Sequence, residues 1–277
     1  MLTSVAIQGY EGSFHHQAAL LHFQEPIQVV PCNSFTQLAK TVSAKKPAVK
    51  WGLMAIENSI AGSILPNYEL ILQHNLTIYG EVFLEINQHL LVNTGTNLAD
   101  IKEVHSHPMA LLQCMQYLGK HHWKLVETDD TALSAKELAA SHKFTRAVIA
   151  SAAAAELYNL EIIAPNIHNS KQNYTRFLLV SAKPNLVHDA SVNKASLYFT
   201  THHQQGSLAK VLQALAQAKV NISKIQSFPI PEAPFTYGFH ADVEFTQLSV
   251  FEKALEAVKE KVVALKVLGT YQKANVK

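Results

Sequence analysis

The feature that most constrains the fold is the regular alternation of short apolar runs with helix-forming segments through residues 1–182. Apolar runs of strand length occupy residues 5–7, 27–30, 52–56 and 147–150. Helical patterns lie between them, the first beginning near Ser13. Alternation of this kind predicts parallel sheets joined by right-handed crossovers. The expected class of this half is therefore α/β.

A polar cluster ends one of these strands. Glu57, Asn58 and Ser59 follow the apolar run 52–56 directly. Parallel sheets place their sites at the carboxyl ends of strands, so these side chains are candidates for a binding site. They are equally compatible with the cap of a following helix.

The pattern changes after residues 182–194, a polar stretch that contains Pro184 and is typical of a linker. We expect strands at 197–200, 221–230, 235–245 and 267–271, and helices at 207–218 and from 248. The order βαββαβ predicts a small ferredoxin-like sandwich over 195–272. One helical layer would cover one sheet face, leaving the other face and an edge free for a partner.

Composition excludes several classes of protein. With 48% hydrophobic and 16% charged residues the chain is expected to be globular, and its net charge of +2 comes without the basic block of a nucleic-acid surface. Cys32 and Cys114 form no disulfide framework, and the histidines show no metal-site spacing, so no metal is expected. The sequence shows neither a signal peptide nor a membrane span, and we expect a soluble, cytoplasmic protein.

Arginine is rare in this chain, which draws attention to Arg176. Only Arg146 accompanies it among 277 residues, and Arg176 follows Thr175 where a polar turn becomes an apolar run. A guanidinium binds a carboxylate through two parallel hydrogen bonds. Arg176 is therefore a candidate carboxylate clamp, although a structural ion pair at a strand end is an equal alternative.

Several short motifs, in this order, together resemble the monofunctional prephenate dehydratase family with a C-terminal ACT regulatory domain. The motifs are Gly9-Tyr10-Glu11-Gly12-Ser13-Phe14, Ala55-Ile56-Glu57-Asn58-Ser59 with Gly62, Ser106-His107-Pro108 with Gln113-Cys114, Asp130-Thr131-Ala132, residues 147–151 with Tyr158, Asn173-x-Thr175-Arg176-Phe177, Gly206-Ser207-Leu208, and Lys224-Ile225-Gln226-Ser227-Phe228-Pro229. The likeness covers nearly the whole chain.

The resemblance implies a fold and an activity. The expected fold is a two-lobed, periplasmic-binding-protein-like α/β catalytic domain over 1–182, followed by a ferredoxin-like βαββαβ ACT domain over 195–272. The expected reaction is the decarboxylating dehydration of prephenate to phenylpyruvate in phenylalanine biosynthesis. No cofactor is needed, and the expected partners are prephenate, phenylalanine as effector, and further copies of the chain in a homodimer or homotetramer.

The resemblance also assigns roles to residues of the first half. The expected catalytic residues are Thr175, Glu57, Asn58 and Gln113. The expected substrate-binding residues are Arg176, Ser13, Ser59, Ser106 and Phe177. Thr175 would donate a hydrogen bond to the departing hydroxyl, with Glu57 as the ultimate acid if burial raises its pKa.

The helix expected at 106–118 has its own pattern. Ser106 is a favourable N-cap, Pro108 is tolerated in the first turn, and Gln113 lies two turns on, near the same face as Ser106. That polar stripe is either the solvated side of a helix or part of the substrate cleft. His15 stands where the family commonly has serine, and one role considered for it is to supply positive charge.

The second half would bind the effector at a dimer interface. The expected contacts are Gly206, Ser207, Leu208, Gln226 and Ser227, with the helix N-terminus at Ser207 receiving a carboxylate. The chain has Gln226 and Phe228 where the family usually has glutamate and arginine. We expect the backbone contacts to the effector to survive this change, and with them feedback control by phenylalanine.

Two alternatives remain open. Arogenate dehydratase has the same fold and nearly the same chemistry. A non-catalytic, amino-acid-sensing binding protein would also have two α/β lobes. The absence of a secretion signal and the intact Thr175-Arg176-Phe177 motif argue against the second.

Overall fold

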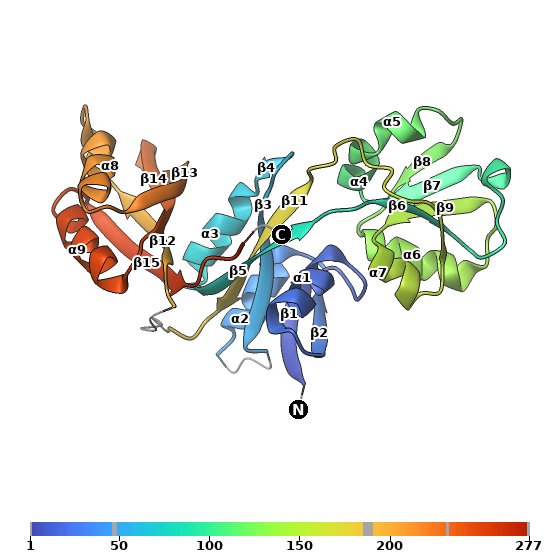
Figure 1. Cartoon of the computed structure of the whole chain (residues 1–277), viewed down its shortest axis with the longest axis horizontal. Coiled ribbons are helices and arrows are strands. Elements are labelled where there is room, and N and C mark those ends of the chain that lie inside the picture. Colours follow the sequence, from blue (N-terminus) through green and yellow to red (C-terminus); the bar gives the residue numbers. More distant parts are fainter. Residues whose placement is uncertain (1, 46–48, 185–190, 231–232, 276–277) are drawn as a thin grey trace. The chain divides into compact units, whose positions relative to one another are not determined.

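The computed structural model describes residues 2–45, 49–184, 191–230 and 233–275, and Figure 1 shows its elements. The chain packs as two compact units. The first runs through Ile64 and resumes over Val82–Phe177, whereas the second comprises Leu65–Glu81 and Leu178–Asn275. The expected linker 182–194 contains residues 185–190, which lie outside the described residues.

The first sheet has the strand order β2-β1-β3-β11-β5, and β4 pairs with β3. Its strands are β1 (Thr3–Gln8), β2 (Ile27–Cys32), β3 (Trp51–Asn58), β4 (Gly62–Ser63), β5 (Thr77–Glu85) and β11 (Tyr174–Ser181). Strand β1 pairs in parallel with both β2 and β3, as the alternation predicts. The boundary between the two units falls within β5 and within β11. Helices α1 (Phe14–Phe23) and α2 (Phe35–Ser43) connect the first strands.

The second sheet also belongs to the first unit and has the order β10-β6-β9-β7-β8. Its elements are β6 (His89–Val92), η1 (Leu98–Asp100), β7 (Glu103–Ser106), α4 (Pro108–Gln113), α5 (Met115–Leu118), β8 (Lys124–Glu127), α6 (Thr131–Ser141), β9 (Arg146–Ala150), α7 (Ala152–Leu157) and β10 (Glu161–Ala164). Strand β7 is parallel to β8 and β9, but β6 is antiparallel to β9 and β10. The sheet is therefore mixed, whereas the sequence predicted a parallel one.

The helix predicted over 106–118 differs from the structure. Ser106 ends strand β7, and His107 is the N-cap of α4, where its Nδ1 accepts a hydrogen bond from the Met109 N–H at 3.2 Å. Cys114 interrupts the helix with φ −111° and ψ 8°, so two short helices replace one. Ser106 therefore lies one residue too early to cap the helix.

The third sheet lies in the second unit and has the order β13-β14-β12-β15, with every pair antiparallel. Its elements are β12 (Lys194–Thr200), α8 (Ser207–Gln217), β13 (Asn221–Ile230), β14 (Ala233–Glu244), α9 (Leu248–Lys259) and β15 (Ala264–Tyr271). This is the βαββαβ order and strand arrangement of a ferredoxin-like fold, with α8 and α9 packed on one face (Figure 1).

The other face of this sheet is covered, which corrects the expectation of a free face. The segment that carries α3 (Leu65–Gln73) and the start of β5 packs against it within the second unit. The Tyr68 ring lies edge-on to His240 with centroids 4.5 Å apart. A Cβ at Gly269 would overlap the carbonyl oxygen of Ile78, so the backbones approach as closely as only glycine permits.

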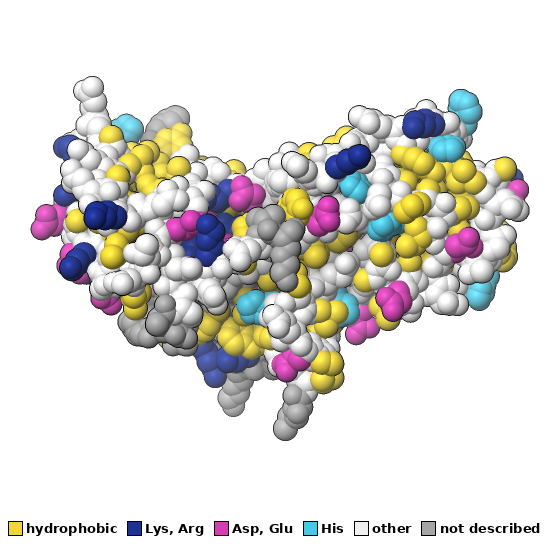
Figure 2. All heavy atoms as spheres, in the orientation of Figure 1, with side chains coloured by type: hydrophobic (Ala, Val, Ile, Leu, Met, Phe, Trp, Pro, Cys, Tyr) yellow, Lys and Arg dark blue, Asp and Glu magenta, His cyan; other side chains and the backbone are white. Residues whose placement is uncertain are grey.

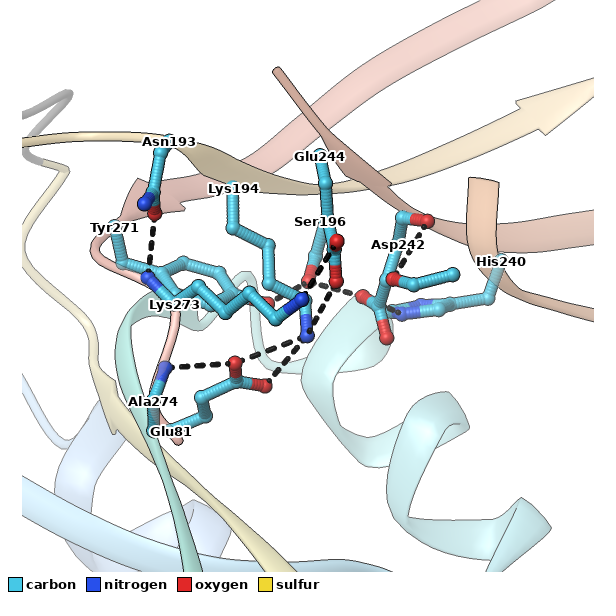
Figure 3. Close-up of polar contacts among 11 residues, drawn as sticks. Glu81, Asn193, Lys194, Ser196, His240, Asp242, Glu244, Tyr271, Lys273 and Ala274 are labelled. Atoms are coloured by element: carbon cyan, nitrogen blue, oxygen red, sulfur yellow. Dashed lines mark hydrogen bonds and ion pairs between the residues drawn. The ribbon is translucent and has the colours of Figure 1, made fainter. Parts of the chain in front are cut away.

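The covered face holds a buried polar network (Figure 3). The Lys194 ammonium lies 2.9 Å from both carboxylate oxygens of Glu81, and both side chains are almost fully buried. Nearby, Asp242 accepts a hydrogen bond from Ser196 at 2.5 Å and lies 3.2 Å from His240 Nε2. Buried charges require partners of this kind, which explains why polar residues alternate along β14 on a face that is not exposed.

The basic side chains and the two cysteines can be located in the structure. Lys and Arg side chains lie in several separate places on the face drawn in Figure 2. Cys32 and Cys114 are both free and buried, and burial raises the pKa of the Cys114 thiol to about 12. Within the described ranges, no helix is long and apolar enough to cross a membrane. The same ranges contain no group of His, Cys, Asp or Glu placed to hold a metal ion.

Candidate functional site

A cavity of about 510 Å³ in the first unit brings together residues from distant parts of the sequence. Ser13, Asn58, Gln113, Thr175 and Phe177 all line it. They come from the N-cap of α1, the end of β3, the end of α4 and the start of β11. Five of the nine residues predicted for the substrate site therefore share one cavity.

Thr175 is held by the side chain of Asn58. The Asn58 Nδ2 donates to Thr175 Oγ1 at 3.0 Å, to Asn173 Oδ1 at 2.8 Å and to the Tyr174 carbonyl at 3.2 Å. An amide donor directed at Oγ1 uses the acceptor side of the hydroxyl and leaves its proton free. Thr175 is thereby oriented as a hydrogen-bond donor toward the cavity that it lines.

Two further amides extend this arrangement. Asn173 is fully buried, and its Nδ2 donates to Gln113 Oε1 at 3.1 Å. The same Gln113 oxygen accepts from Gln88 Nε2 at 3.4 Å. Side chains from β3, α4, the segment before β6 and the start of β11 are thus joined in one row of hydrogen bonds.

Ser59 fixes the chain that leads into β11 rather than lining the cavity. Its N–H donates to the Tyr174 carbonyl at 2.8 Å, and its Oγ donates to the Gln172 carbonyl at 3.1 Å. The Tyr174 N–H in turn donates to Ser59 Oγ at 2.9 Å. Ser59 therefore holds the backbone immediately before Thr175, and it is not among the residues that line the cavity, although it was predicted to bind substrate.

The N-terminus of helix α1 forms another part of the wall. Ser13 caps the helix by accepting a hydrogen bond from the His16 N–H at 3.3 Å, and Ser13, Phe14 and His15 all line the cavity. The positive end of a ten-residue helix attracts anions through its dipole and its N–H groups. This wall is suited to a carboxylate.

Gly9 brings the two sheets of the first unit close together at this point. It has φ +92°, and a Cβ there would lie 2.5 Å from Asp130 Oδ2. Asp130 caps α6 by accepting from the Leu133 N–H at 2.8 Å. Burial raises the pKa of the Asp130 carboxyl, although the N–H groups of Leu133 and Ala132 stabilise its charge. Only glycine leaves room for this carboxylate beside the cavity.

His15 does not supply positive charge, which corrects that interpretation. Its ring lies 4.9 Å from Phe177 and 5.5 Å from Phe35, between centroids. Burial in these apolar surroundings lowers the pKa of His15 to about 3, so the imidazole is neutral near pH 7. Its Nε2 is buried and has no hydrogen-bond partner in the described part of the chain.

The structure does not place Arg176 in the cavity. Side chains alternate along a strand, so Arg176 lies on the face of β11 opposite Thr175 and Phe177. It is buried, and its guanidinium carbon lies 6.0 Å from the centre of the Phe83 ring. A direct clamp on a ligand in this cavity would therefore need another residue.

Two more predicted residues lie outside the cavity wall. Ser106 is fully buried and donates a hydrogen bond to the Ile149 carbonyl at 2.7 Å, so it joins β7 to β9 instead of facing a ligand. Glu57 is half-buried at the end of β3, opposite Ser63 of β4, and is not among the lining residues. Its role as the ultimate acid stays a prediction.

The predicted effector residues fall into two groups in the second unit. Gly206 is the N-cap of α8, and Ser207 and Leu208 line a small cavity of about 180 Å³. Gln226 and Ser227 lie on β13 and do not line that cavity. Within one chain, the structure does not bring these two groups into a single pocket.

A protein-family model matches the part of the chain that contains the cavity. The family model described as prephenate dehydratase matches residues 5–185. The chain belongs to the prephenate dehydratase family.

Relatives of this family match the chain over nearly its full length. The chloroplastic arogenate dehydratase/prephenate dehydratase 2 of Arabidopsis thaliana is 36% identical, covering 96% of this chain and 72% of that protein. The bifunctional chorismate mutase/prephenate dehydratase of Enterobacter agglomerans is 34% identical, covering 98% and 71%.

Solved structures show the same architecture. The prephenate dehydratase of Arthrobacter aurescens in complex with L-Phe superposes with a TM-score of 0.84 at 26% identity, covering 98% of this chain and 90% of that one. GqqA, described as a quorum quenching acylase, superposes with a TM-score of 0.86 at 28% identity, covering 98% of each chain.

Sequence analysis assigned no site role to several polar residues of the dehydratase cavity and of the row of amides beside it. Asn173 was part of a motif but received no role, and Gln88 and Asp129 received none. The two-residue period of β11 contains a usable signal, because Asn173, Thr175 and Phe177 must share a face. No comparable signal marks Gln88, which follows β5 in an irregular segment.

Proposed function

We propose that the chain catalyses the decarboxylating dehydration of prephenate to phenylpyruvate in phenylalanine biosynthesis, as a lyase. The observation that carries this proposal is the Thr175 hydroxyl, which accepts from Asn58 and is left with its proton free at the cavity wall. This is the donor that a departing hydroxyl needs. Membership of the family supports the same reaction.

The chemistry requires two bonds to break together. The bond to the ring carboxylate breaks, its electron pair enters the ring, and carbon dioxide leaves. The ring carbon–oxygen bond breaks at the opposite position, and the hydroxide takes a proton and leaves as water. Formation of the aromatic ring drives the process, so the protein has to orient the substrate and stabilise the charge on the departing oxygen.

Different residues of the cavity would orient the substrate and stabilise the departing oxygen. Thr175 donates a hydrogen bond to the departing oxygen, and Asn58 holds the Thr175 hydroxyl in that direction. The N-terminus of α1 receives a carboxylate. Phe177 and His15 form an apolar floor beside it, where a carboxylate is poorly solvated and loses carbon dioxide more readily.

We assign the catalytic domain to residues 1–182 and an ACT regulatory domain to 195–272. The family model ends at residue 185, and the βαββαβ arrangement of β12 to β15 supports the second assignment. The L-Phe bound by the Arthrobacter aurescens relative supports phenylalanine as an effector. The second chain needed to unite Gly206–Leu208 with Gln226 would come from a homodimer or homotetramer. A cytoplasmic location remains a prediction from the sequence.

Arogenate is the second candidate substrate, and one observation favours it. The acidic side chains that line the cavity are Asp129 and Asp130, and its described lining includes no Lys or Arg. Arogenate carries an ammonium group where prephenate carries a ketone, so nearby carboxylates attract it. The Arabidopsis thaliana relative is named for both substrates.

The test is direct. Purified protein is incubated with prephenate, and phenylpyruvate is followed by its absorbance in alkali. The same protein is incubated with arogenate, and phenylalanine is measured. We expect turnover that the Thr175→Ala variant loses. If the wild-type protein forms neither product, the proposed function is wrong.

A further inference from the structure

We propose that Gln88 is a further substrate-binding residue, whose side-chain oxygen accepts a hydrogen bond from an O–H or N–H of the substrate. The inference rests on the proposed function, because it concerns the same cavity. Its basis is the direction of the hydrogen bonds in the row of amides behind Thr175.

Gln88 is held firmly at the cavity wall. Its side chain lines the cavity and is only 3% exposed. Its carbonyl accepts from the Ile167 N–H at 2.9 Å, and its own N–H donates to His168 Nδ1 at 3.3 Å. Both backbone polar groups of Gln88 are therefore hydrogen-bonded, and they hold its Cα, and with it the base of the side chain, in place.

The polarity of the row is set at Asn58. Its Oδ1 accepts from the backbone N–H groups of Ile60 at 3.0 Å and Ala61 at 2.9 Å. A backbone N–H only donates, so the atom facing these two groups must be the oxygen. The other end of the Asn58 amide, which faces Asn173 and Thr175, must then be the NH₂ group.

The orientation of Asn58 fixes that of the other three amides, because each must place a donor against an acceptor. The atom of Asn173 that faces Asn58 must be an acceptor, so its NH₂ group faces Gln113. The atom of Gln113 in that contact is then Oε1, and Gln88 must offer it a donor, Nε2. Reversing any one amide would bring two oxygens or two NH₂ groups together. The assignment of each oxygen and nitrogen thus follows from the backbone, which resolves an ambiguity that amide groups usually carry.

One acceptor is left over at the end of the row. The Oε1 of Gln88 is buried and has no hydrogen-bond partner among the residues that the structure describes. A buried acceptor without a donor is unfavourable, so a group that enters the cavity and donates to it gains free energy. The carboxylates and the ketone of prephenate only accept, and its ring hydroxyl is its one donor. Arogenate has that hydroxyl and an ammonium group.

The experiment compares Gln88→Met with the wild-type protein. Methionine has a similar volume but offers neither the acceptor nor the donor. Gln116→Met is the matched control, because Gln116 is exposed on α5 and outside the cavity. We measure kcat and KM for prephenate and for arogenate, and the inhibition constant of phenylpyruvate. Keto phenylpyruvate lacks both donors.

We expect Gln88→Met to lose roughly tenfold in kcat/KM, the value of about one hydrogen bond. Its inhibition constant for phenylpyruvate should stay within about twofold of wild type, a result that a purely structural role would not give. Gln88→His, whose neutral ring keeps one donor and one acceptor nitrogen, should recover part of the loss. Equal losses on both substrates identify the ring hydroxyl as the donor, and a larger loss on arogenate identifies the ammonium.

Unchanged kcat/KM in Gln88→Met would overturn the inference while leaving the proposed function intact. An inhibition constant for phenylpyruvate that weakens as much as kcat/KM would also overturn it, since the side chain would then only support Gln113. If Gln88→Met does not fold, Gln88→His takes its place in the test. The inference is then wrong if Gln88→His is inhibited by phenylpyruvate as strongly as wild type is, but has a kcat no higher than that of Thr175→Ala. A wild-type chain inactive on both substrates would remove the proposed function and this inference together.

Discussion

Replacing Asn58 by aspartate reverses one hydrogen bond without changing the shape of the side chain. The remaining oxygen still accepts from Ile60 and Ala61. The NH₂ group that donates to Thr175 Oγ1 becomes a second carboxylate oxygen. Thr175 can then satisfy that oxygen only by donating its own proton to it, which withdraws the proton from the substrate.

The surroundings of the Asn58 side chain set the size of the effect. Asn58 is 9% exposed, and its Nδ2 faces three oxygens at 2.8–3.2 Å, so Asn58→Asp buries a charge among acceptors. Burying an uncompensated charge costs about 3–5 kcal/mol of stability. Losing a general acid or its hydrogen bond lowers turnover by roughly 10²–10⁴-fold. We therefore expect kcat to fall by about that factor with a smaller change in KM.

The pH dependence distinguishes this explanation from simple damage. Burial among oxygens raises the pKa of the introduced carboxyl above its unfolded value of about 3.9. The protonated carboxyl donates as the amide does, so the kcat of the variant, relative to wild type, should rise as pH falls through that raised pKa. The free energy of unfolding should likewise fall as pH rises from about 3.9 through the raised pKa.

The assay is kcat on prephenate between pH 5 and 9, with chemical unfolding over the same range. Asn159→Asp is the matched control, because it makes the same charge change at an exposed turn. A variant at Asn58 whose relative kcat does not change with pH, or which keeps wild-type turnover, would refute the proposed orientation of Thr175.

Three further predictions concern other parts of the molecule. Thr175→Ala should lose roughly 10²–10⁴-fold in kcat with a modest change in KM, whereas Thr175→Ser should retain most of it; equal losses would exclude the hydroxyl as the cause. The pKa of His15 is about 3 in the folded protein and 6.5 normally, so the free energy of unfolding should fall less between pH 6.5 and pH 3 in His15→Phe than in wild type. The same fall in both proteins would contradict the buried neutral ring. Glu81→Gln leaves the Lys194 ammonium without its main partner and should cost about 3–5 kcal/mol in urea unfolding; a cost under about 1 kcal/mol would contradict the buried pair.

The order of elements could be predicted because it depends on local patterns. The first helix begins next to Ser13, as predicted, and the strands and helices of the second half appear in the predicted order βαββαβ. Hydrophobic periodicity and capping act over a few residues, and both are readable in a single sequence.

The contacts between distant segments could not be predicted in the same way. The polar face of β14, with His240 and Asp242, has the pattern of an exposed face, yet α3 covers it. Covering it depends on residues more than 150 positions away in the chain, and the sequence gives no local sign of them. A buried polar network and a solvated face have the same alternation.

The candidate site was predicted in part. The segments that line the cavity came from the family resemblance, but Arg176 and Ser106 do not lie in it. The position of Arg176 follows from the two-residue period of β11 and could have been read from Thr175 and Phe177. The place of Ser106 depends on β7 being one residue longer than the helical pattern indicates.

The central claim is that prephenate occupies this cavity with its ring hydroxyl at the Thr175 side chain. The most direct test is a crystal structure of the Thr175→Ala variant, which should bind prephenate and turn it over only slowly, frozen after a short soak with prephenate. The account predicts the departing oxygen within about 3 Å of the position left by the Thr175 hydroxyl, with a carboxylate at the start of α1. A ligand bound elsewhere, or one whose ring hydroxyl faces away from residue 175, would contradict it.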